Sequence, residues 1–265
     1  MKSIADVNEM RKIQMDILLF IHQFCIDNGI QYSLAWGTML GAIRHKGYIP
    51  WDDDIDIMMT RPEYDRFCKL FHDERSIYKL YDVHTDKKWI YPFAKISDER
   101  TIRVEKNALD EIGINIDVFP IDFYADSYED AMKALKRMKF WKKIYVAKIL
   151  RSYTGMSLLK NIIYHLYKIP CSLIPLKFVL KKFDEISCVT SKGKTAYCGF
   201  LVEATKAVVL KSEIFDKYAE YQFESHRFHG VENYDSYLRT TYGDYMTPPP
   251  IDQRYAHEVV GMYWK

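Results

Sequence analysis

The sequence lacks several features that would place it in other classes of protein. It has no C-x-x-C pair, which argues for reduced thiols and against a disulfide framework or a zinc site. No run of roughly 18 or more apolar residues is present, so no segment is expected to span a membrane. The N-terminal stretch MKSIADVNEMRK is charged where an export signal is apolar. We therefore expect a cytoplasmic protein that can also sit peripherally at the inner face of the cell membrane.

Acidic residues are absent from one long segment. Residues 131–183 contain 13 Lys or Arg and no Asp or Glu, so the net charge of +2 divides into +13 here and −11 elsewhere. Between Lys136 and Arg151 the basic residues alternate with apolar and aromatic ones. This pattern is compatible with docking on an anionic membrane, with a groove for an anionic acceptor chain, or with a helical subdomain whose lysines are solvated. No nucleic-acid recognition motif accompanies the charge, so no nucleic acid partner is expected.

The remaining composition is that of a folded protein, with 265 residues, 48% of them hydrophobic and 28% charged. Hydrophobic spacing predicts helices over residues 3–28, 39–45 and 62–72, and a basic helical stretch over 127–182. Strands are predicted over residues 30–36, 49–59, 78–84, 92–96, 101–105 and 113–119. The fold class expected from this alternation is α/β (α+β), a mixed sheet flanked by helices with a basic helical insertion.

The acidic run Trp51-Asp-Asp-Asp-Ile-Asp-Ile57 is the most informative motif. If residues 49–59 form one strand, then Asp52, Asp54 and Asp56 line one of its faces. Carboxylates two residues apart on a strand lie roughly 6.6 Å from each other and repel by about 2.5 kcal/mol at an effective dielectric of ~20. Such a face needs cations, and ligands that are all oxygen favour a hard divalent ion such as Mg²⁺, with Mn²⁺ as a substitute. The alternative is a solvated acidic turn that caps a helix.

A glycine turn precedes the acidic run. Gly37 and Thr38, with Gly41 three residues on, join a predicted strand to a predicted helix, where free N–H groups and the helix dipole attract anions. Gly37 lets an anion approach the main chain, and the Thr38 hydroxyl either caps the helix or binds phosphate. Arg44 follows closely enough to neutralise phosphate charge, although a solvated surface charge is the default for such a residue. A phosphate site beside a carboxylate-bound metal is typical of phosphoryl and nucleotidyl transfer.

Two further side chains complete the predicted site. In the strand over 113–119, Asp117 points away from Ile116 and Val118, so it can join the metal ligands or accept a proton from an attacking hydroxyl. Its alternative role is to bind backbone N–H groups at a strand end. Lys95 lies within an apolar stretch and therefore needs an anionic partner, which we expect to be a substrate phosphate or Asp56.

Three blocks of this sequence resemble the LicD-type phosphocholine transferases. The first runs from Trp36 to Ile57, the second is Ile116-Asp-Val-Phe-Pro-Ile-Asp122, and the third runs from Tyr242 through Pro249 to Arg254 and His257. The family shares a nucleotidyltransferase-like core with the fukutin-related phosphosugar transferases. The resemblance implies a Mg²⁺-dependent transfer of phosphocholine from CDP-choline to a hydroxyl of a glycan, a cell-wall or teichoic-acid precursor that is lipid-linked, with release of CMP.

The resemblance also assigns residues by position. Asp54 and Asp56 correspond to the metal-binding pair, Asp52 to an auxiliary ligand and Asp117 to the third acid. Gly37 and Thr38 fall on phosphate-loop positions. Arg44, Lys95, Arg254 and His257 are the other candidates for binding phosphate or nucleotide, and the last two alternatively lock the C-terminal loop onto the core.

Choline cannot donate a hydrogen bond through its quaternary nitrogen, so aromatic faces are expected to cage it. The aromatic candidates near the motifs are Trp36, Trp51, Trp89, Tyr91 and Tyr242. For each of them, an ordinary place in the core is the competing interpretation.

We expect the chain to divide into a nucleotidyltransferase-like catalytic core over 1–125, a basic helical subdomain over 126–195 that binds membrane or acceptor, and a segment over 196–265 that packs back and completes the active site. The role of the middle subdomain does not follow from the resemblance. Two other functions stay open. The same core could be a nucleotidyltransferase that modifies a small acceptor, or the chain could be a non-catalytic, membrane-associated scaffold with this fold. The acidic set argues against the scaffold, because an idle site has no reason to tolerate the repulsion.

Overall fold

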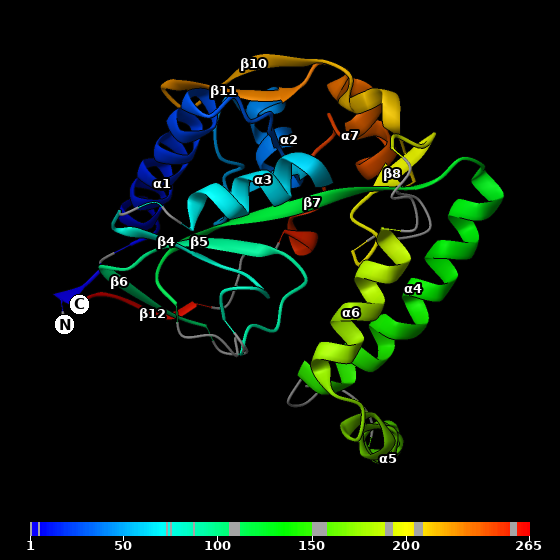
Figure 1. Ribbon diagram of the computed structural model, residues 1–265. Coiled ribbons are helices and arrows are strands. Elements are labelled where there is room, and N and C mark those ends of the chain that lie inside the picture. The colour runs from blue at the N-terminus through cyan, green and yellow to red at the C-terminus, as the bar shows by residue number, and fades with distance from the viewer. Residues whose placement is uncertain are drawn as a thin grey trace. The chain divides into compact units, whose positions relative to one another are not determined.

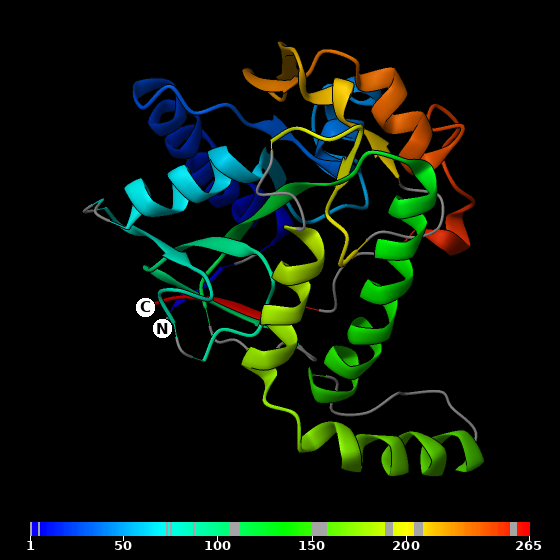
Figure 2. The ribbon, with the colours of Figure 1, turned by 45° about the vertical axis from the view of Figure 1, so that its right-hand side comes forward.

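The computed structural model describes residues 2–4, 6–72, 74, 76–86, 88–105, 112–149, 158–188, 193–203, 209–254 and 259–265. The chain divides into two compact units, the first formed by Met1–Ile121 and Leu210–Lys265 and the second by Asp122–Val209. Figures 1 and 2 show the elements of each unit as ribbons. Helices and strands together form a mixed α/β architecture, which confirms the predicted fold class.

The helices and strands have the following bounds. The helices are α1 (Val7–Asp27), α2 (Trp36–Arg44), α3 (Arg61–Phe71), α4 (Tyr128–Ile149), α5 (Leu158–Ser172), α6 (Leu176–Ser187), η1 (Ser212–Phe215), α7 (Tyr234–Tyr242) and η2 (Ile251–Gln253). The strands are β1 (Lys2–Ser3), β2 (Ser33–Leu34), β3 (Asp56–Thr60), β4 (Tyr78–Tyr81), β5 (Ala94–Asp98), β6 (Thr101–Glu105), β7 (Asn115–Ala125), β8 (Tyr197–Gly199), β9 (Leu210–Lys211), β10 (Tyr218–Phe223), β11 (His226–Val231) and β12 (Val259–Trp264).

The first unit is built on a mixed sheet with the strand order β2-β3-β7-β5-β4. β3 and β7 are parallel, while the other neighbours in this order are antiparallel. One face of these strands carries Ile57, Ile96, Ile116 and Val118, all of them fully buried. Because side chains alternate along a strand, the opposite face carries Asp56, Lys95 and Asp117.

Two helices pack on each other and contact this sheet. α1 contacts β5 and α3 contacts β3. Phe20 and Phe24 of α1 meet Phe71 of α3 at ring-centroid distances of 6.0 and 5.1 Å. Asp6 caps α1 by accepting hydrogen bonds from the N–H groups of residues 8 and 9. The prediction that this helix begins at Ser3 was therefore wrong, because Ser3 pairs in β1 with Tyr263 of β12.

The acidic run differs from its prediction in secondary structure. Only its last aspartate, Asp56, belongs to a strand, and residues 52–55 have no regular structure. The predicted single strand over 49–59 is therefore wrong, and with it the strand alternation that put three carboxylates on one face. Similarly, the predicted strand over 30–36 shortens to Ser33–Leu34, because the following helix already begins at Trp36 rather than Met39.

The other predicted elements occur with shifted bounds. The helix over 62–72 and the strands over 78–84, 92–96 and 113–119 correspond to α3, β4, β5 and β7. The strand over 101–105 has its predicted bounds. β7 continues through Pro120 to Ala125, well past its predicted end.

The second unit contains the basic segment as three helices. α4 and α6 lie side by side, and α5 lies across their ends (Figures 1 and 2). Pro175 is the N-cap of α6, while Pro170 lies inside α5 rather than interrupting it. In the parts of the chain that the structure describes, no helix is both long and apolar enough to cross a membrane.

Candidate functional site

Three charged side chains lie in one row across the sheet of the first unit. Asp56 on β3 is the register partner of Asp117 on β7, which in turn pairs with Lys95 on β5. Lys95 Nζ lies 3.0 Å from Asp117 Oδ1, and both side chains are about four-fifths buried, at 16% and 20% exposure. We had expected Asp56 to be the carboxylate partner of Lys95, but the direct ion pair is with Asp117. Strand pairing thus gathers residues that are 22 to 61 positions apart in the sequence.

The carboxylates of the acidic run lie close enough to Asp117 to alter one another's ionisation. Burial, followed by the charges of Asp54, Asp117 and Asp52, raises the pKa of Asp56 well above its ordinary value. Burial and Asp54 raise the pKa of Asp52 to about 7. Burial also raises the pKa of Asp117, and Lys95 counteracts that increase. These charge effects show that Asp52, Asp54, Asp56 and Asp117 lie near one another, and a loop rather than a strand carries Asp52 and Asp54.

The absence of a side chain at Gly37 allows the Asp52 carboxylate to approach the start of α2. A Cβ atom at Gly37 would lie 2.5 Å from Asp52 Oδ2, so the Asp52 carboxylate lies directly against the first turn of α2. The free N–H groups and positive dipole end of a helix N-terminus favour a carboxylate in this place. The glycine that we assigned to phosphate binding therefore also positions Asp52.

Thr38 connects α2 to the acidic strand. Its hydroxyl accepts a hydrogen bond of 2.8 Å from the Asp56 N–H, and the side chain is buried. The N-cap of α2 is Ala35, so the alternative in which Thr38 caps this helix is wrong. Trp36 begins the helix with a φ of 35°, and its N–H donates to the Tyr237 hydroxyl at 2.9 Å. A non-glycine residue in this region is strained, and the bond to Tyr237 helps to hold it there.

The loop that carries Asp52 and Asp53 is held in place by contacts with β6 and α1. Asp53 is buried and forms an ion pair with Arg103 of β6, with 3.5 Å between Oδ2 and Nη2. Gln14 Nε2 donates to the Asp53 carbonyl at 3.0 Å, and Arg11 donates to the carbonyls of residues 49, 50 and 52. These contacts fix the main chain, so that the neighbouring carboxylates keep their positions.

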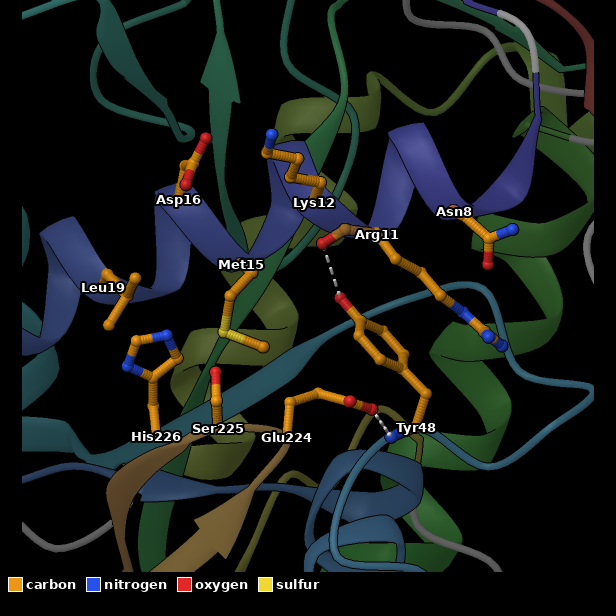
Figure 3. A pocket seen from close by; sticks show the side chains of 10 residues that line it. All are labelled: Asn8, Arg11, Lys12, Met15, Asp16, Leu19, Tyr48, Glu224, Ser225 and His226. Carbon is orange, nitrogen blue, oxygen red and sulfur yellow. Dashed lines mark hydrogen bonds between the residues drawn. The ribbon is translucent and has the colours of Figure 1, made fainter.

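Tyr48 extends this anchor to the hairpin β10–β11. Its ring lies under the Arg11 guanidinium at 4.7 Å, and its hydroxyl donates to the Arg11 carbonyl. Glu224, in the turn of the hairpin, accepts a hydrogen bond from the Tyr48 N–H at 3.0 Å. Figure 3 shows both contacts at the edge of a pocket of about 440 Å³ between α1 and the hairpin turn. This support could not be predicted from the sequence, because its partners lie up to 176 positions apart.

The candidate cations Arg44 and Arg254 lie near each other. Arg44 Nη1 donates to the Tyr245 carbonyl at 2.6 Å, and burial together with Arg254 lowers the pKa of Arg44. Arg254 lies over the ring of Trp51 at 4.3 Å, and its Nε donates to the Pro249 carbonyl at 3.0 Å. The C-terminal loop is therefore fastened to the acidic run through Arg254. His257 lies outside the described residues.

Aromatic rings form a continuous row beside Lys95. Trp36, Phe119, Phe93 and Tyr91 follow one another at centroid distances of 4.3, 4.4 and 5.4 Å. Lys95 Nζ lies 5.1 Å from the Tyr91 centroid and 5.8 Å from that of Phe93, so a cation already sits against these rings. We did not predict Phe93 or Phe119. Strand alternation would have identified them, because they lie two residues from Lys95 and Asp117 respectively.

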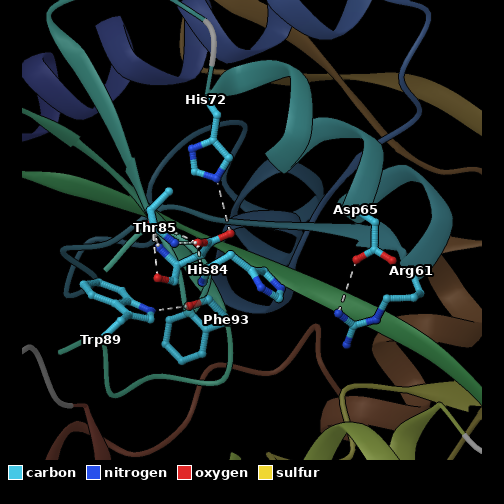
Figure 4. Close-up of polar contacts among 8 residues, drawn as sticks. Arg61, Asp65, His72, His84, Thr85, Trp89 and Phe93 are labelled. Atoms are coloured by element: carbon cyan, nitrogen blue, oxygen red, sulfur yellow. Dashed lines mark hydrogen bonds and ion pairs between the residues drawn. The ribbon is translucent and has the colours of Figure 1, made fainter. Parts of the chain in front are cut away.

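The other predicted choline residues have different surroundings. Trp89 is buried and stacks on Tyr81. Its Nε1 donates to the Phe93 carbonyl at 2.9 Å (Figure 4), so it holds Phe93 of the row in place. The pKa of Tyr242 is raised well above its ordinary value. The main cause is burial of the phenol, and the charges of Tyr237 and of the carboxylates of the acidic run add to it. Because 42% of the residue is exposed, its ring is accessible while its hydroxyl faces the acidic side chains.

The arrangement suits phosphoryl chemistry, although it is not a closed metal cage. Within the described ranges no three acidic, histidine or cysteine side chains converge as a group that could hold a metal ion. The carboxylates with raised pKa values still suit a hard divalent cation as ligands, because all their donor atoms are oxygen. A mixed sheet with a glycine-containing helix start beside paired acids is the frame of a nucleotidyltransferase-like domain.

Sequence comparison narrows this class to one family. Residues 29–158 match the model of the LicD/FKTN/FKRP nucleotidyltransferase domain. The chain is 28% identical over 270 residues to the lipopolysaccharide cholinephosphotransferase LicD of Haemophilus influenzae, covering 97% of both chains. It is also 30% identical over 119 residues to an uncharacterized protein of Rickettsia typhi, covering 45% of this chain and 36% of that one. The chain belongs to the LicD-type family.

Proposed function

We propose that this protein transfers phosphocholine from CDP-choline to a hydroxyl of a glycan and releases CMP. The observation that carries the proposal is the row Asp56, Asp117 and Lys95, which lies next to Asp52 and Asp54 at the start of α2. The relative from Haemophilus influenzae, whose name is that of a cholinephosphotransferase, aligns along nearly its full length. The proposal extends this activity to the present chain.

Asp54, Asp56 and Asp117, with Asp52 as an auxiliary ligand, are the residues proposed to hold one or two Mg²⁺ ions. Burial, followed by the charges of neighbouring carboxylates, raises the pKa values of Asp52, Asp56 and Asp117, and a divalent cation would offset both effects. When bound, the metal supplies charge neutralisation for the diphosphate and for the departing CMP.

The side chains of the protein divide the remaining work. Lys95 pairs with Asp117 Oδ1, so Asp117 Oδ2 is the oxygen that either ligates the metal or accepts the proton of the attacking glycan hydroxyl. Lys95 Nζ, in the same row, is placed to attract the oxygens of the transferred phosphate. Gly37, Thr38, Arg44, Arg254 and His257 are the further residues proposed to bind the diphosphate. Arg44 and Arg254 contribute two cations from opposite ends of the chain.

The trimethylammonium group is proposed to bind at the aromatic row. Lys95 Nζ already lies against Tyr91 and Phe93, so the trimethylammonium group would need aromatic faces of the row that the lysine does not cover. Each such contact contributes about 0.5–2 kcal/mol. Trp36 and Tyr242 flank the acidic side chains and stay candidates, whereas Trp51 is covered by Arg254 and Trp89 lies behind the row.

The acceptor is proposed to be a lipid-linked glycan. The family resemblance points to a teichoic-acid precursor, while the name of the Haemophilus relative points to lipopolysaccharide. Both carry sugar hydroxyls, and a panel that includes both separates them.

The test is a transfer assay with purified protein, labelled CDP-choline, the acceptor panel and a titration of Mg²⁺. We expect release of CMP and labelled glycan that depends on the metal. Asp56→Asn should reduce turnover at least about 100-fold, because it removes a charge that acts on the transition state. Its matched control is Asp65→Asn, since the Asp65 side chain on α3 is 63% exposed and forms an ion pair with Arg61 (Figure 4).

Three results would reject the proposal or part of it. Release of pyrophosphate from CTP, with a nucleotide joined to a small acceptor, would assign the core to nucleotidyl transfer. If no acceptor gives turnover and the melting temperature does not change with CDP-choline or Mg²⁺, the protein would be assigned to a non-catalytic scaffold. Full activity in Asp56→Asn would remove the proposed role of the carboxylates.

A further inference from the structure

An apolar stripe is exposed along α5 and the turn that follows it. Ile162, Leu166, Ile169 and Leu173 have exposed fractions of 52%, 61%, 63% and 82%. Their spacing of four, three and four residues places them on one face of the helix. We call these four residues the α5 stripe.

The α5 stripe takes no part in the core of the second unit. α5 is attached to α4 by its other side, where Cys171 is buried and Lys148 Nζ donates to the carbonyls of Cys171 and Ser172 at 3.1 and 3.3 Å. The core itself is formed between α4 and α6, for instance by Tyr145 and Phe183, whose rings lie 5.4 Å apart. Four large aliphatic side chains are therefore exposed to water without contributing to the core of the second unit.

We propose that the α5 stripe docks the protein onto the surface of an anionic membrane. A helix with one apolar face lies in the plane of the interface, with that face among the acyl chains and its basic surroundings at the head groups. Tyr167 of α5 and Phe178 of α6 are 41% and 45% exposed, and aromatic rings favour the interface. α5 therefore lies on the bilayer rather than across it.

Charge selects the membrane over other occupants. Residues 131–183 carry 13 basic side chains and no acidic one. Lys177 and Lys181 on α6 are among the exposed lysines of this segment. A second copy of the chain would bring two such basic surfaces together and would be repelled, whereas anionic head groups complement them.

The structure also moves the docking surface from where the sequence suggested it. Between Lys136 and Arg151, Met138, Ile144 and Tyr145 are buried inside the second unit, whereas Phe140 is 59% exposed. The larger group of exposed aliphatic side chains in the second unit lies along the next helix, α5, and the turn that follows it. The inference concerns only this helix and does not depend on which reaction the first unit performs.

Flotation of the full-length protein with lipid vesicles tests the proposal. Wild-type protein should float with vesicles of phosphatidylcholine mixed with phosphatidylglycerol, and less with phosphatidylcholine alone, and rising salt should weaken the binding. The variant Leu166→Ser with Ile169→Ser should bind at least about tenfold more weakly. Both positions are exposed, so a thermal melt should show that the variant folds normally.

The matched control is Ile26→Ser with Ile77→Ser, which removes two exposed isoleucines of the first unit and should float like wild type. A wild type that stays unbound with anionic vesicles overturns the proposal, as does a stripe variant that floats unchanged. Sedimentation velocity of both proteins identifies the main alternative. A wild-type dimer that the stripe variant dissociates, without vesicle binding, would assign the stripe to contact between copies.

Discussion

The Asp52 carboxylate lies against Gly37 so closely that a Cβ atom there would stand 2.5 Å from Asp52 Oδ2. This contact joins the start of α2 to the acidic run and explains why a glycine occurs at a helical position where alanine is intrinsically more favourable. The position of one carboxylate of the candidate site thus depends on a missing side chain.

Gly37→Ala should therefore displace Asp52 and reduce phosphocholine transfer roughly 10- to 100-fold, since small misplacements of catalytic groups have effects of this size. Folding should change little, because alanine favours the helix while the clash opposes it. The measurements are the transfer rate and the melting temperature.

A double-mutant cycle separates this effect from general damage. If Gly37→Ala acts through Asp52, it should cost little further activity in a background that already carries Asp52→Ala. Independent, multiplying losses in the double variant would show that Gly37 acts in some other way, for instance directly on the diphosphate.

Tyr91 offers a test of the aromatic row. Tyr91→Leu should raise the KM for CDP-choline by about 2- to 30-fold, which corresponds to the loss of one cation–π contact. The rate at saturating donor should change less, because the acids are untouched. The control is Tyr128→Leu, an exposed tyrosine of the second unit that is paired with Tyr197. An unchanged KM in Tyr91→Leu would place the trimethylammonium group elsewhere.

Part of the site could be predicted because it depends on patterns within short segments of the sequence. The alternation of Asp117 with Ile116 and Val118 predicted correctly that the carboxylate leaves the buried face of the sheet. The density of acids at 52–56 predicted a gathering of charge, although the backbone there is a loop. Such a loop escaped prediction because Ile55 and Ile57 imitate strand alternation.

Long-range partners could not be predicted in this way. Nothing near Asp53 indicates that its partner is Arg103, 50 positions later, because the pairing requires β6 and the acidic loop to meet in the fold. The hairpin β10–β11 was missed as well, since its turn contains Glu224 at a φ of 55° where glycine or asparagine would have signalled a turn.

The buried pair of Asp53 and Arg103 should be important for stability. Arg103→Met removes the buried cation that pairs with the Asp53 carboxylate and should lower the free energy of unfolding by about 3–5 kcal/mol in urea titrations. Asp53→Leu combined with Arg103→Met should recover much of that loss, since no charge is then left alone. Equal stability of the single variant and wild type would mean that the pair contributes nothing to folding.

His22 should make folding stability depend on pH. Its Nδ1 lies 2.8 Å from the Tyr32 hydroxyl, its ring meets His229 edge-on, and Glu220 lies near enough to act on it. Burial and His229 lower the pKa of His22, so the folded protein binds a proton here less readily than the unfolded chain does. Stability is therefore complete above the unfolded value of about 6.5 and falls as the pH drops through it.

His22→Gln should remove this contribution and flatten the decline of the melting temperature between about pH 7 and pH 5. Glutamine keeps a hydrogen-bonding group near Tyr32 without a titrating charge. The control is His84→Gln, which changes an exposed histidine of the turn after β4 (Figure 4) and should leave the decline as it is in wild type. If His22→Gln retains the full decline, other groups must be responsible for the loss of stability in acid.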